Sequence, residues 1–151
     1  MPDQVFEMWI AHGLQHGLEW RFSADSETAT GTDWELFFGH SSLTFWRKAD
    51  WLLTSIIPSP ELFHLETKAR VIAIIGWCVH GQQTPTTNVH DSKNRFATFA
   101  DIIRKTGKLP CPVVGAETAD GLEIVDGNHR LAAVVYLGLA NSFNLPIWIA
   151  H

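Results

Sequence analysis

The feature that most constrains the fold is the order of apolar segments and turn residues in the C-terminal third of the chain. Two short apolar segments, 113–117 and 122–125, flank the dipeptide Asp120-Gly121. This dipeptide is typical of tight hairpins, because both of its positions can adopt positive φ. The second segment then leads directly through Asp126-Gly127-Asn128-His129-Arg130 into a run of Leu, Ala and Val. We therefore predict two antiparallel strands, a sharp turn and a buried helix, in that order.

Glycines mark where the neighbouring elements end. A helix is predicted over 130–137, with Gly138 just past its end, and 145–150 is predicted to be a short apolar strand. Upstream, a second helix is predicted over 92–106, followed by Gly107. Four apolar residues of this second helix recur at i, i+3, i+4 and i+7 and so share one face: Phe96, Phe99, Ala100 and Ile103.

Periodicity is less informative in the first eighty residues. Ser59-Pro60-Glu61 is typical of a helix start. The apolar segment 71–79 suits a buried helix or a core strand, and we favour a helix that ends at Gly81. Segments 34–38 and 44–46 are strand-like or ambiguous between strand and helix.

The size and composition of the chain fit one globular domain. A domain of 151 residues can bury a sizeable core, and no apolar run approaches the roughly 18 residues that a membrane span needs. The N-terminus shows no secretory signal pattern, so we expect a cytoplasmic protein with no membrane association. A net charge of −5 disfavours nucleic acid as a partner, because binding along a phosphate backbone normally requires a basic face.

Cysteine and tryptophan usage adds two expectations. Cys78 and Cys111 have no metal-binding spacing, and we expect buried free thiols. The chain has seven tryptophans, most of them in the first half. Large aromatic side chains usually pack into cores, and they are also enriched at protein interfaces. The tryptophan-rich half is therefore a candidate surface for a protein partner.

The segment 126–130 has the properties of an anion-binding turn. A strand that turns directly into a helix presents backbone N–H groups and the positive end of the helix dipole. Gly127 lets the backbone approach a ligand closely, and the planar guanidinium of Arg130 matches phosphate oxygens. His129 can donate a hydrogen bond or move a proton near neutral pH. We predict a phosphate-binding loop formed by Gly127, Asn128, His129 and Arg130.

Asp126 is unexpected in such a loop, because a carboxylate repels phosphate. Three roles would explain it: a metal ligand, a base that takes a proton from a nucleophile, or the N-cap of the following helix. If Asp126 is only the N-cap, then Asn128 is a turn residue, and His129 and Arg130 are solvated.

The stretch 124–133, followed by Gly138 and the strand at 145–150, resembles the signature of the ParB/sulfiredoxin superfamily. The helix at 92–106, Gly107 and Leu109-Pro110 also resemble that family, so the likeness covers about 89–151. The resemblance implies an α+β fold, with a core of helix, hairpin, strand-turn-helix and strand over about 84–151. Residues 1–80 would form an aromatic-rich N-terminal extension within the single domain 1–151.

The resemblance also implies a function at the same loop. Members of the superfamily bind nucleotide phosphates there, so a nucleoside triphosphate is the expected ligand and Mg²⁺ the expected cofactor, held through Asp126. Asp126 resembles the aspartate that serves the chemical step in the serine kinases of the family, which implies NTP hydrolysis or phosphoryl transfer with Asp126 and His129 as catalytic residues. Sulfiredoxins have a cysteine where this chain has Asn128, which argues against sulfinic acid reduction.

Two other functions remain open. A metal-dependent nuclease would need a basic stripe, for which Arg95, Arg104, Lys105 and Lys108 are the candidates. A non-catalytic module would bind a nucleotide or a protein without turnover.

A second ligand-contacting segment is predicted before and within the first turn of the helix at 92–106. Its candidates are His90, Asp91, Lys93 and Asn94. The alternative is a solvated first turn with Asp91 or Ser92 as the N-cap, since such residues are typical of helix starts.

Overall fold

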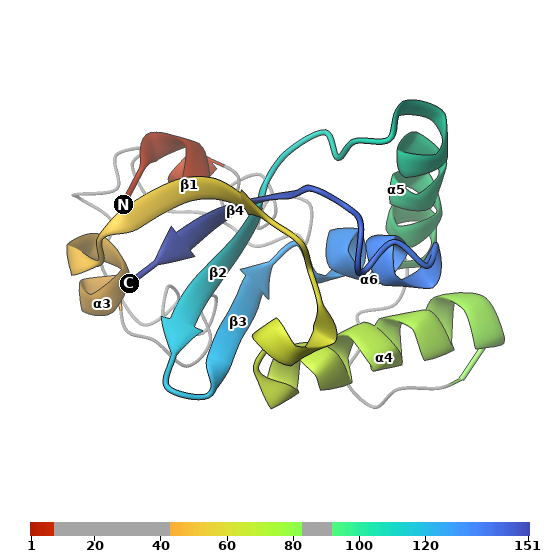
Figure 1. The fold of residues 1–151 in the computed structure, drawn as a ribbon, viewed down its shortest axis with the longest axis horizontal. Coiled ribbons are helices and arrows are strands. Elements are labelled where there is room, and N and C mark those ends of the chain that lie inside the picture. The colour runs from red at the N-terminus through yellow and green to blue at the C-terminus, as the bar shows by residue number, and fades with distance from the viewer. Residues whose placement is uncertain (8–42, 83–91) are drawn as a thin grey trace, which may run out of the picture. The chain divides into compact units, whose positions relative to one another are not determined.

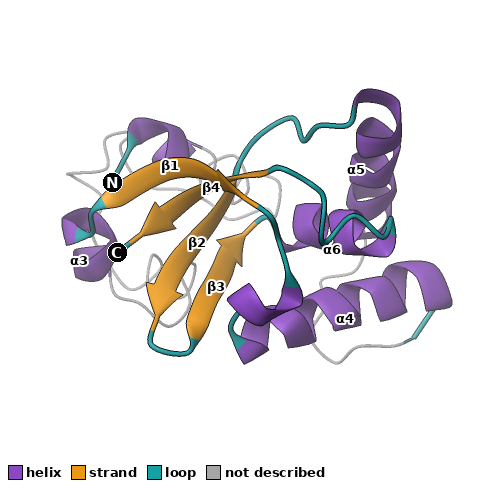
Figure 2. Cartoon of the chain, viewed as in Figure 1, coloured by secondary structure: helices purple, strands orange, loops and turns teal. Residues whose placement is uncertain are grey.

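The computed structural model describes residues 1–7, 43–82 and 92–151, and it has the mixed helix and strand content expected of an α+β fold. The chain divides into two compact units, Met1–Leu52 with Ala150–His151, and Leu53–Ile149. Figures 1 and 2 show the helices and strands of the described residues. The segment 34–38, predicted to be strand-like or ambiguous, lies outside the described residues. No helix in the described ranges is long and apolar enough to cross a membrane.

The described residues form one four-stranded sheet and several helices. The strands are ordered β1-β4-β2-β3, and in Figure 1 β4 points in the same direction as β2, whereas β3 runs opposite to both. The bounds of the elements from residue 43 onward are α3 Leu43–Lys48, β1 Trp51–Ile56, η1 Pro60–Leu62, α4 Leu65–His80, α5 Ser92–Thr106, β2 Val113–Thr118, β3 Gly121–Asp126, α6 Asn128–Tyr136 and β4 Leu145–Ala150.

In the first unit, the segment 44–46 is helical and belongs to α3. The side chain of Trp46 is almost fully buried, and its backbone carbonyl accepts a hydrogen bond of 3.0 Å from the indole Nε1 of Trp51. The rings of these two tryptophans lie 5.9 Å apart. Aromatic residues suit strands as well as buried helices, which is why periodicity left this short segment ambiguous.

The predicted hairpin is confirmed, but its turn lies one residue earlier than expected. β2 and β3 are antiparallel, with Thr118 paired to Gly121, so Ala119 and Asp120 form the turn. Gly121 has a φ of 121°, whereas no residue other than glycine has a positive φ in the described part of the chain. Asp120 therefore does not use the positive φ that the Asp-Gly pattern allows. Instead, the hydroxyl of Thr118 closes the turn by donating to the Gly121 carbonyl at 2.6 Å.

The helices predicted in the second unit are confirmed, with two corrections. The helix predicted over 130–137 is α6, which spans Asn128–Tyr136 and so begins two residues earlier. α5 spans 92–106 and buries Phe96, Ala100 and Ile103, the face that its periodicity predicted. α4 is a helix that ends at Gly81, which has a φ of 67°. The start predicted at Ser59-Pro60-Glu61 opens the short 3-10 helix η1, not α4. His64 is extended between η1 and α4, and its Nδ1 accepts a hydrogen bond from the Glu66 N–H at 3.2 Å, which caps α4.

The core of the second unit lies around α6, which packs against both α4 and α5 (Figure 1). Leu131, Ala132, Ala133 and Val134 of α6 are all nearly inaccessible to solvent. A helix can bury so much of its circumference only when neighbours cover several of its sides, which explains its continuous apolar sequence. This burial holds the first turn of α6, and therefore the 126–130 loop, in a fixed position.

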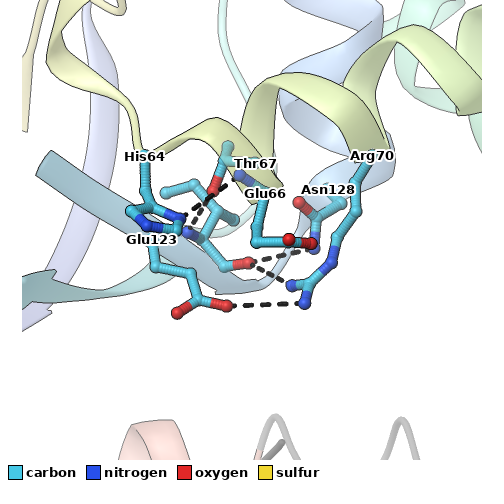
Figure 3. Close-up of polar contacts among 7 residues, drawn as sticks. His64, Glu66, Thr67, Arg70, Glu123 and Asn128 are labelled. Carbon is cyan, nitrogen blue, oxygen red and sulfur yellow. Dashed lines mark hydrogen bonds and ion pairs between the residues drawn. The ribbon is translucent and has the colours of Figure 1, made fainter. Parts of the chain in front are cut away.

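The outer edge of the sheet, strand β3, is covered by η1 and α4. The His64 N–H donates to the Leu122 carbonyl at 3.0 Å, and the buried hydroxyl of Thr67 accepts from the Ile124 N–H at 2.8 Å. Arg70 Nη1 donates to the Ile124 carbonyl at 3.3 Å (Figure 3). Unpaired backbone groups on an edge strand invite pairing with another chain. Here the backbone of His64 and the side chains of Thr67 and Arg70 satisfy these groups.

Thr67→Val tests how much this edge contact stabilises the fold. Valine matches threonine in shape but has no hydroxyl, so the buried Ile124 N–H loses its partner. The free energy of unfolding should fall by about 1–3 kcal/mol, the usual cost of an unsatisfied buried donor. Urea denaturation measures the change. Thr98→Val, at an exposed position of α5, is the matched control and should change it by less than about 0.5 kcal/mol. Equal effects of the two substitutions would contradict this prediction.

Candidate functional site

The strand-turn-helix predicted at 126–130 is present. β3 ends at Asp126, Gly127 adopts a left-handed conformation with φ 91° and ψ 19°, and α6 begins at Asn128. A β-bulge lies immediately before the turn, because Asp126 pairs with Val114 while Ile124 pairs with Gly115. Bulges redirect a strand and its side chains. The bulge therefore sets the direction in which β3 enters the loop.

Arg130 is buried beneath the loop, with 8% of its surface accessible. Its Nη2 donates to Asp126 Oδ2 at 2.6 Å, and its Nη1 donates to Cys111 Sγ at 2.9 Å. The guanidinium carbon also lies 5.8 Å from the centre of the Phe99 ring. The alternative in which Arg130 is solvated is therefore wrong. A guanidinium can be buried at this depth because a carboxylate of opposite charge lies next to it.

Gly127 is needed at this turn for two reasons. Its positive φ is costly for any residue with a side chain. In addition, a Cβ atom at this position would lie 2.7 Å from Nε and Nη2 of Arg130 and 2.7 Å from Cγ1 of Val113. The glycine thus leaves the space that the buried guanidinium occupies. Sequence reasoning assigned Gly127 to close approach of a ligand, and the structure places a side chain of the same protein in that space.

Asp126 is not the N-cap of α6, because the N-cap is Gly127. Its carboxylate instead pairs with Arg130, and only 13% of the Asp126 side chain is accessible. Sequence reasoning did not consider this role, although the spacing i, i+4 is typical of ion pairs. Here the pair crosses from the end of a strand into the first turn of a helix. The chain must therefore turn sharply at Gly127 for the two side chains to meet.

Cys111 is the residue of this site that sequence reasoning missed. It lies in the loop before β2, and it is half-buried with its sulfur against Arg130. No spacing motif links residue 111 to residue 130, so only the fold brings them together. The other free cysteine, Cys78, is half-buried on α4. Burial raises the pKa of the Cys78 thiol, although the nearby charges of Lys93 and Arg95 oppose this effect. A raised pKa keeps a thiol protonated and unreactive.

Asn128 and His129 occupy the first turn of α6 and are both partly buried. Asn128 Nδ2 donates to the Ile124 carbonyl at 3.2 Å, the same oxygen that Arg70 contacts (Figure 3). The Asn128 Oδ1 atom is buried and has no hydrogen-bond partner among the described residues. An amide with one satisfied and one unsatisfied end is a suitable contact for a donor group on a ligand or a water molecule.

The donor set at Asp126 does not fit Mg²⁺. This ion binds oxygen ligands, usually one or two carboxylates together with substrate phosphates. The Asp126 carboxylate is already paired at 2.6 Å with a guanidinium, whose positive charge would repel a metal ion. No group of three His, Cys, Asp or Glu side chains gathers among the residues that the structure describes. The Mg²⁺ site stays a prediction of the sequence.

The second predicted segment is only partly described. His90 and Asp91 lie outside the described residues, so the prediction that Asp91 is the N-cap is not tested. Ser92 is the first residue of α5. Lys93 is exposed, and its Nζ lies 5.0 Å from the centre of the Trp77 ring on α4, while Asn94 is exposed on the first turn. The contact between α5 and the loop comes from Phe99, further along the helix.

The four basic residues that a nuclease would need are spread along α5 and beyond it. Arg95 lies in the first turn, and Arg104 and Lys105 lie in the last turn. Arg104 lies nine positions after Arg95, which is about 13 Å along the helix axis. Lys105 is also paired with Asp101 at 2.6 Å. Cations at a helix C-terminus stabilise the helix dipole, which explains Arg104 and Lys105 without a nucleic acid.

Three comparisons with known proteins found no match: no family model, no curated protein and no solved structure corresponds to this chain. The resemblance to the ParB/sulfiredoxin superfamily therefore stays a prediction.

Gly127→Ala measures how closely the loop encloses the guanidinium. Alanine at this left-handed position should cost about 1–2 kcal/mol through its backbone alone. The contacts of its Cβ with Arg130 and Val113 should add about 1–3 kcal/mol. Gly138→Ala is the matched control, since Gly138 has a φ of 72° and a Cβ added there would meet no atom of the described residues within 4 Å, apart from its chain neighbours. Urea denaturation of both variants gives the difference, and equal losses of stability would contradict the packing described here.

Proposed function

We propose that this protein binds the phosphate groups of a nucleotide at the N-terminus of α6, in the loop Asp126 to Arg130. The observation that carries the proposal is a helix that begins directly after a strand with a glycine as its N-cap. Glycine has no side chain to accept hydrogen bonds from the first N–H groups of the helix. Groups of this kind, together with the helix dipole, bind anions.

The contrast with α4 supports this proposal. At the start of α4, the His64 side chain accepts a hydrogen bond from the Glu66 N–H, so that helix is capped by its own sequence. The N-cap of α6 offers no equivalent acceptor. A phosphate oxygen could accept a hydrogen bond from an N–H group of this first turn. The buried surroundings of α6 would strengthen such a contact, because electrostatic attraction is greater where water is excluded.

The ion pair between Arg130 and Asp126 makes this site different from one in which an exposed, unpaired arginine binds phosphate. Asp126 neutralises Arg130, so the loop has little net charge from this pair. An incoming phosphate would contribute negative charge close to the guanidinium. Arg130 could then share its donors between the carboxylate and the phosphate, as guanidinium groups have five N–H donors in one plane. In this proposal Asp126 serves to hold Arg130 in position beneath the loop.

The proposal extends to hydrolysis or phosphoryl transfer, the activity expected from the sequence. Asp126 would be the base, with its orientation set by Arg130, and His129 would be a proton donor or acceptor in the first turn of α6. Binding without turnover is the alternative, and it is an outcome of the second experiment below. The structure offers no specific observation that favours a nuclease.

Arg130→Lys tests the binding site. Lysine keeps a positive charge opposite Asp126 but loses the planar set of donors, so affinity for ATP should fall about tenfold or more. Isothermal titration calorimetry with ATP, GTP and inorganic phosphate, with Mg²⁺ or with EDTA, measures the change. Arg104→Lys at the far end of α5 is the control and should bind like the natural protein. Absence of binding by the natural protein, or full affinity of Arg130→Lys, would reject the site.

Asp126→Asn separates an enzyme from a binding protein. The substitution keeps the size of the side chain and removes its charge, so a base at this position would be lost. If the protein is a phosphotransferase or NTPase, phosphate release should fall by about a hundredfold or more. Nucleotide affinity should stay level or rise, because repulsion is relieved. Circular dichroism must show that the variant is folded, since Arg130 loses its charged partner.

Asp101→Asn on the exposed face of α5 is the matched control for the turnover assay and should release phosphate at the natural rate. Unchanged turnover in Asp126→Asn would rule out this residue as the base. If the natural protein releases no phosphate at any metal concentration, the protein is a binding module.

A further inference from the structure

Two buried polar atoms in the first turn of α6 have no hydrogen-bond partner in the part of the chain that the structure describes. They are Oδ1 of Asn128 and Nε of Arg130. The first atom is an acceptor, and the second carries an N–H donor. Proteins leave few buried polar groups unsatisfied, so two of them at the start of one helix point to a ligand. The inference drawn from them rests on the proposed phosphate site, which lies at the same helix start.

The unsatisfied donor of Arg130 adjoins the N-cap of α6. Only 10% of the Arg130 side chain is accessible, and its Nη1 and Nη2 atoms already donate to Cys111 and Asp126. A Cβ atom added to Gly127 would lie 2.7 Å from both Nε and Nη2, so this edge of the guanidinium faces the N-cap glycine. The N-terminus of α6 therefore has a buried donor beneath it in addition to its own first N–H groups, and both kinds of donor suit an anion.

The orientation of the Asn128 amide is set by the Ile124 carbonyl. Asn128 Nδ2 donates to this oxygen at 3.2 Å, and Arg70 Nη1 donates to the same oxygen from α4 (Figure 3). Turning the amide over would place Oδ1 against the carbonyl oxygen, and two acceptors repel each other. Oδ1 is therefore an acceptor that points away from Ile124, and it needs a donor from another source.

The position of Asn128 determines which part of a ligand its Oδ1 atom meets. Asn128 is the first residue of α6, so its side chain lies next to any anion that the first N–H groups of this helix bind. A fully deprotonated oxyanion presents only acceptor oxygens, and one of them would repel Oδ1. A phosphate that keeps one proton has a P–OH group, which can donate to Oδ1 while its other oxygens accept from N–H groups. Such a ligand matches both unsatisfied atoms.

We propose that α6 binds the terminal phosphate of its ligand in the singly protonated form, with Asn128 Oδ1 accepting a hydrogen bond from the P–OH group. Sulfate, a phosphodiester and an internal phosphate of a nucleotide have no such proton near neutral pH. The ligand is therefore a phosphate monoester, or a nucleotide held by its terminal phosphate. Asn128 determines this specificity, because a site built to accept a hydrogen bond rejects an analogue that lacks the donor.

Inorganic phosphate and sulfate are the matched probes for this proposal. At a pH of about 8 both ions are tetrahedral and carry two negative charges, but only phosphate keeps a proton. In isothermal titration calorimetry at equal ionic strength, the natural protein should bind phosphate about tenfold or more tightly than sulfate. Equal affinities would overturn the inference and leave the phosphate site standing. If phosphate, sulfate and ATP all fail to bind, the proposed site is rejected and the inference with it.

Asn128→Leu and Arg70→Leu isolate the contribution of Oδ1. Each variant removes one of the two donors to the Ile124 carbonyl, which keeps the other donor. Only Asn128→Leu also removes Oδ1, so in this variant the ratio of phosphate to sulfate affinity should fall to about one. Arg70→Leu should keep the natural ratio, because the Glu123 carboxylate that loses its partner repels two ions of equal charge equally. A natural ratio in Asn128→Leu would overturn the inference.

Asn128→Asp keeps the inference testable if circular dichroism shows that Asn128→Leu is unfolded. A carboxylate at this position still accepts from a P–OH group, whereas it repels sulfate. The ratio of phosphate to sulfate affinity should therefore equal or exceed that of the natural protein. A ratio that falls to about one in a folded Asn128→Asp variant would contradict the role of this residue.

ATP and ATP with a methyl ester on its γ-phosphate test which phosphate α6 binds. The ester has the same charge as singly protonated ATP but has no P–OH group. It should bind about tenfold more weakly or worse than ATP. Equal affinity of the two nucleotides would overturn the assignment of the terminal phosphate to this site.

Discussion

The buried ion pair between Asp126 and Arg130 is the interaction on which the rest of the site depends. It joins the last residue of β3 to the first turn of α6 across the left-handed Gly127, at a distance of 2.6 Å. The same guanidinium contacts Cys111 and lies near Phe99. The Arg130 side chain therefore connects α6 with β3, with the loop before β2 and with α5. Removing one partner of a buried pair leaves an uncompensated charge, which costs several kcal/mol. The geometry of the loop and the stability of the fold are therefore coupled.

The second constraint is the polar backbone of the edge strand β3. Its groups at Leu122 and Ile124 are satisfied by His64, Thr67 and Arg70, which lie at the start of α4. These contacts fix the inner side of α4 and leave its opposite side apolar and exposed. The helix thus protects this edge of the sheet from pairing with another chain.

Local sequence patterns predicted the C-terminal elements well, because each has a strong short-range signal. The face of α5 formed by Phe96, Ala100 and Ile103, the strand Leu145–Ala150 and the strand-turn-helix at 126–130 all match the structure. The signal failed where two conformations suit the same residues. The turn before β3 shifted by one residue because Thr118 could close it by a side-chain hydrogen bond. The same ambiguity left the aromatic segment at 44–46 undecided between strand and helix.

The sequence by itself determined where the chain turns at the site, since only glycine readily adopts the positive φ found at Gly127. It also determined that a helix rich in Leu, Ala and Val follows that turn. Only the tertiary structure decided what the charged residues do. Arg130 faces inward because the turn directs it towards Asp126, and Cys111 meets it because the loop before β2 passes beside α6. Contacts between residues distant in sequence depend on how the elements pack, and no local pattern encodes that packing.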